Sequence, residues 1–166
     1  MPLPWRPLRI LLVVNAFASS VTARNTVVVH RALSQGNEVE VVETNRRGHA
    51  TRFAQDAARR GVDVVVGFGG DGTLNEVATG VAGTDTALGV LPGGSTNVFA
   101  RTIGWPMEPR EAIDRLVRAI DAGQPAQPVT IGHVEASGQE RFFIVNAGVG
   151  IDAEAADMVE RHPEWK

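Results

Sequence analysis

The 166-residue sequence contains no cysteine and only one lysine, Lys166, and each absence removes a class of chemistry. Without cysteine there is neither a disulfide framework nor a thiolate metal site. The remaining basic residues are arginines, so the phosphate-binding loop G-x-x-x-x-G-K-[ST], which needs an internal lysine, is also excluded. Any phosphate must be held by other groups.

Positive charge, aromatic side chains and long apolar runs are scarce as well. The formal net charge is -3 and aromatic residues make up 5% of the chain, which disfavours a nucleic-acid partner. No apolar run approaches the roughly 18 residues of a membrane span, and "LRILLVV" is too short for a signal peptide. We therefore expect a cytoplasmic protein whose membrane contact, if it has any, is peripheral at the inner membrane face.

Four short apolar runs rich in β-branched residues alternate with amphipathic segments. The runs, at 8–14, 38–43, 62–68 and 87–92, predict strands. The segments around 21–34, 49–60, 73–81 and 109–122 have apolar residues at helical spacing. This alternation predicts an α/β fold, namely a three-layer Rossmann-like parallel sheet flanked by helices, over residues 1–128.

The pattern changes after "GQPAQP" at 123–128. Residues 129–147 predict two strands that turn at Ser137-Gly138, the signature of an antiparallel hairpin. We expect a second, β-rich unit over 129–166 that is incomplete, because a lone hairpin is marginally stable. Apolar residues exposed there, such as Phe142, Phe143 or Val145, would favour a homodimer.

The first chemistry-bearing stretch is "VVVGFGGDGTLNEV" at 64–77, where a buried strand runs into a glycine-rich loop. Glycine lets a ligand approach the backbone closely, which indicates phosphate. The loop fits the dinucleotide fingerprint G-x-G-x-x-G, but the following strand ends in "VLPGG" without the acidic residue that holds a ribose. A plainer alternative is a capping box of Thr73 and Glu76, which would still leave N–H groups facing an anion.

Asp71 is the residue in this loop that a plain turn does not need. A carboxylate beside a phosphate repels it unless a divalent cation lies between them, as Mg²⁺ does in most phosphoryl-transfer sites. Asp71 is therefore a candidate magnesium partner, directly or through water.

A second strand ends in glycines in "GVLPGGSTNVFAR" at 89–101. Two such loops at the carboxyl ends of parallel strands would converge on one ligand crevice. Asn15 and Thr44 follow the first two predicted strands and would lie at the same edge. The alternatives are an Asn or Thr helix cap in the second loop, and ordinary turn chemistry for Asn15 and Thr44. The second loop contributes the candidates Gly94, Ser95, Thr96 and Asn97.

A basic group follows Thr44 along the chain and consists of Arg46, Arg47, His49 and Arg52. It could face phosphate or anionic headgroups, although a charge cluster is usually a solvated face.

Together, "GFGGDGTLNEVATGV" and "LGVLPGGSTNVFAR" resemble the diacylglycerol kinase catalytic domain of bacterial lipid kinases and of sphingosine and ceramide kinases. The resemblance implies an enzyme that uses ATP and Mg²⁺ to phosphorylate a lipid hydroxyl. It also implies that Asn15, Thr44 and Thr96 are nucleotide-site residues. The positions that it assigns to the nucleotide phosphates are Gly70, Asp71, Gly72, Thr73, Asn75 and Glu76.

The sequence departs from this family in two motifs. "NAFAS" stands where the family has N-P-x-x-G, and Val98 stands where an aspartate commonly follows the asparagine of the second loop. The family also places its catalytic carboxylate in a C-terminal β-sandwich domain, so we expect that residue beyond Lys166. This leads us to expect that the chain alone binds nucleotide without catalysis. An NAD kinase-like enzyme and a non-catalytic nucleotide-binding fragment are the alternatives.

Overall fold

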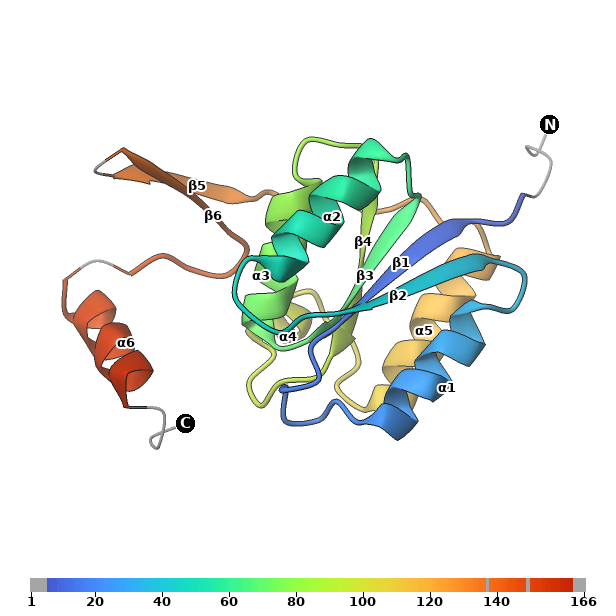
Figure 1. Ribbon diagram of the computed structural model, residues 1–166, viewed down its shortest axis with the longest axis horizontal. Helices are drawn as coiled ribbons and strands as arrows, with labels where there is room; N and C mark the ends of the chain where they lie inside the picture. Colours follow the sequence, from blue (N-terminus) through green and yellow to red (C-terminus); the bar gives the residue numbers. More distant parts are fainter. Residues whose placement is uncertain (1–5, 137, 149, 163–166) are drawn as a thin grey trace.

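The computed structural model describes residues 6–136, 138–148 and 150–162. Its centre is a parallel sheet in the order β2-β1-β3-β4 (Figure 1). The strands are β1 (Arg9–Val14), β2 (Glu38–Glu43), β3 (Val64–Gly69) and β4 (Ala87–Pro92). The four predicted strands and their parallel pairing are confirmed.

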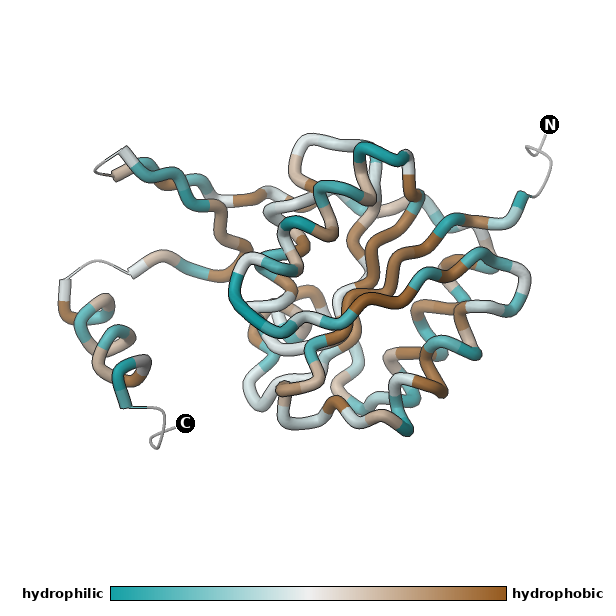
Figure 2. The backbone as a smooth tube through the Cα atoms, in the orientation of Figure 1, coloured by the Kyte–Doolittle hydropathy of each residue, from teal (hydrophilic) through white to brown (hydrophobic). Residues whose placement is uncertain are grey.

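The central strands are buried on both faces because their apolar runs are continuous. Successive β1 side chains point to opposite faces, so Ile10 and Leu12 belong to one core cluster and Leu11 and Val13 to another. Figure 2 shows the strands as the hydrophobic centre of the molecule, with hydrophilic residues on the outer helices.

Two helices cover each face of the sheet, which gives the predicted three layers. On one face lie α1 (Ala23–Leu33) and α5 (Pro109–Asp121), and on the other α2 (His49–Arg59) and α3 (Asp71–Val81). Local signals fix several starts: Thr22 caps α1, Glu108 caps α5, and Pro109 occupies the first turn of α5. None of the helices in the described part of the chain is both long enough and apolar enough to span a bilayer.

The strand order creates a switch point between β1 and β3. The chain leaves β1 through α1 to reach β2 on one side, and then returns through α2 to β3 on the other side of β1. In open parallel sheets, ligands bind outside the carboxyl ends of strands at such a point.

The remaining elements follow β4. A short helix α4 (Val98–Thr102) comes after the second glycine-rich loop, and β5 (Gly132–Ala136) pairs antiparallel with β6 (Gln139–Phe143). This confirms the hairpin, while Ser137 of its predicted turn lies outside the described residues. A final helix, α6 (Ile151–Arg161), was not predicted; hairpin and α6 extend to one side of the sheet (Figure 1). The division into units at residue 128 stays a prediction.

Candidate functional site

A hollow of about 320 Å³ lies beyond the carboxyl ends of β1 and β2, against the starts of α2 and α3 and beside the switch point. Five of the predicted site residues line it, namely Asn15, Thr44, Gly72, Thr73 and Glu76. Its other lining residues are Phe17, Asn45, Arg46, Arg47 and Ala50. The fold thus brings together residues that follow two strands, β1 and β2, and residues from the first turn of α2 and the first two turns of α3.

Asn15 joins the end of β1 to helix α3. Its side-chain Oδ1 accepts a hydrogen bond from the backbone N–H of Phe17 at 3.1 Å, and its Nδ2 donates to Thr73 Oγ1 at 3.1 Å. Thr44 is buried, and its N–H and hydroxyl both donate to the carbonyl of Val14. The turn chemistry expected as an alternative for Asn15 therefore exists, but the same side chain also positions Thr73.

The glycines of the first loop serve two different needs. A Cβ on Gly69 would lie 2.6 Å from Thr73 Oγ1, and one on Gly67 would lie 2.9 Å from Leu74 Cδ2. Packing therefore demands glycine at both positions. A Cβ on Gly72 would meet no described neighbour within 4 Å, and Gly72 is exposed at the hollow. Packing against described neighbours therefore does not demand glycine at this position.

The capping box predicted for Thr73 and Glu76 is wrong because α3 begins two residues earlier, at Asp71, after Gly70. Thr73 then lies inside the first turn and accepts from Asn15. The Glu76 carboxylate instead accepts from the backbone N–H groups of Gly48 and Ala50, at 2.9 and 3.1 Å, at the start of α2. Within the described residues, no side chain caps α3, so its first N–H groups face the loop.

Asp71 ties the two glycine-rich loops together. Its Oδ2 accepts from Thr96 Oγ1 at 3.1 Å and from Val98 N–H at 2.9 Å, and its Oδ1 accepts from Phe99 N–H at 3.0 Å. The carboxylate therefore caps α4, a role that the sequence did not indicate. Nowhere in the described ranges do three or more His, Asp or Glu side chains gather as a metal site. The magnesium role of Asp71 stays a prediction.

The second loop lies directly against the first, as predicted. Gly93 N–H donates to the carbonyl of Gly69 at 2.8 Å, and a Cβ on Gly94 would lie 2.7 Å from the Cα of Gly70. Ser95 and Thr96 are exposed beside it.

Asn97 stands at the N-cap position of α4 with a φ of 48°, but its side chain makes no cap bond to α4 within the described chain. Its Oδ1 accepts from Gly94 N–H at 2.9 Å and its Nδ2 donates to Gly94 O at 2.7 Å, which closes the loop. The alternative that an Asn or Thr side chain of this loop caps the helix is therefore wrong, because the Asp71 carboxylate accepts the first N–H groups of α4. Residues 94–97 border the first loop without lining the hollow.

Two arginines give the hollow positive charge. Arg46 and Arg47 line it, and Arg46 Nε donates to His49 Nε2 at 2.6 Å. The other ring nitrogen, His49 Nδ1, is buried and without a hydrogen-bond partner among the described residues. The basic group that could have been a solvated face thus contributes two side chains to the site, while Arg52 is exposed.

Sequence reasoning missed Phe17, Asn45 and Ala50. Phe17 is 80% exposed at the rim of the hollow, in the loop where the family motif is altered. A single aromatic residue in a loop forms no periodic pattern with its neighbours. Only its place in the loop after β1, next to Asn15, could have indicated that Phe17 lines the hollow. Asn75, in contrast, was expected at the nucleotide, but its side chain makes hydrogen bonds to Phe142 near the end of β6 and to Ile144 just after it.

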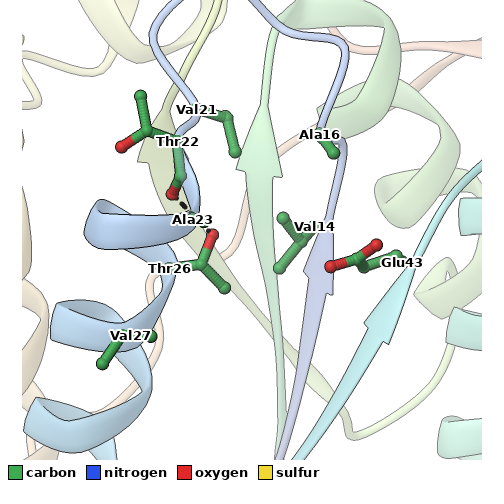
Figure 3. A pocket seen from close by; sticks show the side chains of 8 residues that line it. All are labelled: Val14, Ala16, Val21, Thr22, Ala23, Thr26, Val27 and Glu43. Atoms are coloured by element: carbon green, nitrogen blue, oxygen red, sulfur yellow. Dashed lines mark hydrogen bonds between the residues drawn. The ribbon is translucent and has the colours of Figure 1, made fainter.

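A second hollow of about 260 Å³ lies between the start of α1 and the ends of β1 and β2 (Figure 3). The side chains around it are mostly small and apolar, with Glu43 at one side and Thr26 Oγ1 bonded to the carbonyl of Thr22. Among the described residues that line it, none is a predicted site residue. Of these two hollows in the described part of the chain, the first combines a glycine, hydroxyls and arginines.

A parallel sheet flanked by helices, with glycine-rich loops after two adjacent strands, defines a doubly wound α/β domain. The family model of the diacylglycerol kinase catalytic domain matches residues 9–125. The chain therefore belongs to this family, and the predicted resemblance is confirmed.

Named relatives agree with this assignment. The chain is 40% identical over 126 residues to "Diacylglycerol kinase" of Bacillus subtilis (strain 168), covering 74% of this chain and 39% of the relative. It is 35% identical over 120 residues to "Probable lipid kinase YegS-like" of Cronobacter sakazakii, covering 70% of this chain and 37% of the relative. The crystal structure of a diacylglycerol kinase from Bacillus anthracis str. Sterne superposes with a TM-score of 0.61 at 27% identity, covering 80% of this chain and 47% of that one. The chain thus spans about two fifths of the length of these curated relatives.

Proposed function

We propose that these residues form the nucleotide-binding part of an ATP-dependent lipid kinase that transfers the γ-phosphoryl group to a hydroxyl of diacylglycerol or a related lipid. The relatives with printed names are lipid kinases, which supports this proposal over an NAD kinase-like enzyme. A lipid acceptor implies peripheral contact with a membrane surface.

The observation that carries the proposal is Gly72, a glycine that the fold does not need, in the wall of a hollow with two arginines. A phosphate resting there would meet the first N–H groups of α3 and the positive end of its dipole. Thr73 and Thr44 would supply hydroxyls, and Arg46 and Arg47 would supply charge. Gly94, Ser95, Thr96 and Asn97, which border the first loop outside the hollow, would face the nucleotide from the second loop.

Asp71 fits Mg²⁺ through water better than through direct coordination. A carboxylate has about four lone-pair positions, and three of those on Asp71 already accept hydrogen bonds. Mg²⁺ characteristically keeps several waters and takes its other ligands from phosphates. When bound, ATP–Mg²⁺ would supply the transferable phosphoryl group. The residues of this chain would orient and neutralise the phosphates, which is the larger part of catalysis in phosphoryl transfer.

We propose that the binding site for the lipid acceptor, and the base that accepts its hydroxyl proton, lie outside these residues. General-base assistance contributes typically 10²–10⁴-fold, and positioning the acceptor contributes further. We therefore expect this chain alone to bind ATP without phosphorylating diacylglycerol. Transfer of labelled phosphate to diacylglycerol by the purified chain would contradict that expectation.

Calorimetry with and without magnesium tests the nucleotide role. Asp71→Asn removes the negative charge and should weaken Mg²⁺–ATP binding far more than metal-free ATP binding. Damage to the α4 cap alone would weaken both by the same factor, so equal losses would refute the magnesium role. Asp85→Asn is the matched control, because Asp85 is an exposed aspartate in the loop before β4. It should leave both affinities unchanged.

A further inference from the structure

The side chain of Asn75 copies the hydrogen bonding of a β-strand. Its Nδ2 donates to the carbonyl of Phe142 at 3.1 Å, and its Oδ1 accepts from the N–H of Ile144 at 3.0 Å. One residue that bonds to the carbonyl before and the N–H after an intervening residue is the pattern of a parallel ladder. A helix side chain thus takes the place of a strand beside the end of β6.

An apolar contact lies next to these hydrogen bonds. The side chain of Ile144 packs on a core cluster that contains Leu74 of α3, Val90 of β4 and Phe99 of α4. Leu74 directly precedes Asn75, and Phe99 also donates its N–H to Asp71. Residues 142–144 therefore contact α3 and α4, the helices that follow the two glycine-rich loops.

We call these contacts of residues 142–144 the joint. The joint matters because the rest of the hairpin is largely exposed. Residues 133–136 and 138–141 are exposed, whereas 142–144 are partly buried. Figure 1 shows the hairpin extending away from the sheet, with the end of β6 near α3. The attachment is therefore concentrated at one short segment.

We propose that Asn75 is a positioning residue that fastens the β5–β6 hairpin to α3, rather than a ligand of the nucleotide. The residue lies one helical turn after Asp71, so the fastening sets the position of the β-rich unit relative to the phosphate loop. This role rests on hydrogen bonds within the chain and does not depend on the proposed function.

Amide hydrogen exchange at Ile144, followed by NMR, tests this proposal. Asn75→Ala removes the acceptor, and exchange at Ile144 should become about tenfold faster, the size expected for one hydrogen bond. Asn75→Asp keeps an acceptor for Ile144 but loses the donor to Phe142, so its effect should be smaller. In the same variants the affinity for ATP should stay within about twofold of the original, a difference well below 1.4 kcal/mol.

Asn37 provides a matched control because its side chain also donates one hydrogen bond to a backbone carbonyl and accepts one from a backbone N–H, at the opposite end of the sheet. Its Oδ1 accepts from Leu8 N–H and its Nδ2 donates to Leu33 O, both at 3.1 Å. Asn37→Ala should leave exchange at Ile144 unchanged, so acceleration by both variants would indicate general loosening and refute a specific joint.

Two further outcomes would overturn the proposal. The first is unchanged Ile144 exchange in Asn75→Ala, above all if ATP affinity falls, which would make Asn75 a nucleotide ligand. The second outcome is measured on the unaltered chain, so it can be obtained even if Asn75→Ala does not fold. There the amide of Ile144 should exchange more slowly than the adjacent amide of Val145. Equal exchange rates would refute the joint. Failure of the unaltered chain to bind ATP would contradict the proposed function while leaving the exchange result to decide this proposal.

Discussion

At the scale of single residues, the motif at 69–76 holds the fold together as well as forming a loop. Its polar side chains reach four different elements: Thr73 meets β1 through Asn15, Asp71 caps α4, Asn75 binds the segment after β6, and Glu76 binds the start of α2. The sequence predicted the loop and its residues. It could not predict these partners, because they lie 26 to 69 positions away along the chain and only the packed fold brings them close.

Gly72→Ala tests whether glycine at this position is required for ATP affinity or for the stability of the fold. The added methyl meets no described neighbour within 4 Å, so stability should stay equal or rise by up to about 1 kcal/mol from helix propensity. Affinity for ATP should fall by about tenfold or more, because the methyl enters the space proposed for phosphate, a loss of at least about 1.4 kcal/mol. Urea unfolding and calorimetry measure the two effects.

Gly80→Ala is the control for that change. A Cβ on Gly80 would lie 2.5 Å from the Cβ of Ala54 and 2.7 Å from the carbonyl of Thr51, where α2 and α3 pack. It should destabilise the protein by about 1–3 kcal/mol. Unchanged ATP affinity in Gly72→Ala would show that the phosphate does not approach this glycine.

At the scale of elements, the sequence predicted the sheet better than the helix ends. Strands β1, β3 and β4 are nearly continuous apolar runs that favour burial, so their positions follow from composition. Strand β2 lies at the edge of the sheet, and its valines alternate with glutamates. The start of α3 was misplaced because Thr73 and Glu76 imitate a capping box, whereas the chain turns at Gly70. Helix α6 was missed because it follows the hairpin, where a β-rich unit was expected, and because residues 151–159 are exposed and pack on no described core cluster.

Asp63 fastens the opposite, amino-terminal edge of the sheet and should make stability depend on pH. Its carboxylate accepts from the Arg6 guanidinium and, at 2.8 Å, from Arg9 N–H at the start of β1. Burial acts to raise the pKa of Asp63, but the hydrogen bonds and charges of Arg6 and Arg9 outweigh it and hold the pKa below 3.8. Because the folded pKa lies below the unfolded one, the stabilisation is complete above the unfolded value and is lost as the pH falls through the folded value.

The measurement is urea unfolding from pH 7 down to pH values below 3.8, the ordinary pKa of Asp63. Asp63→Asn should be less stable than the unaltered chain at pH 7, and the difference should shrink on acidification. Asp114→Asn, at an exposed position on α5, should show no such difference. A gap between Asp63→Asn and the unaltered chain that stays constant with pH would contradict this assignment.

At the scale of the whole molecule, the α/β unit has its own core whereas the hairpin depends on its joint with α3. Val134 and Val145 are 39% and 38% exposed, and the Phe142 ring stacks on His133 at 4.9 Å. A two-stranded hairpin with exposed valines is the kind of surface that pairs with another chain.

We predict that the 166-residue chain self-associates through the hairpin as its concentration rises. The double variant Val134→Lys, Val145→Lys places charge on β5 and just after β6, and it should shift sedimentation toward the monomer because charge on an exposed hairpin opposes pairing. Val27→Lys is the control, since Val27 is 65% exposed on α1. Dissociation caused by Val27→Lys, but not by the hairpin variant, would place the contact on α1 instead.

The central claim is that nucleotide binds at the switch point between β1 and β3. An NMR titration of the isotopically labelled chain with ATP and Mg²⁺ tests it most directly. The account predicts that the largest amide shifts fall at Gly70–Thr73, Asn15–Phe17 and Thr44–Arg47, around the 320 Å³ hollow. Largest shifts at Val21–Val27, around the hollow beside α1, or no shifts at saturating ATP, would contradict it.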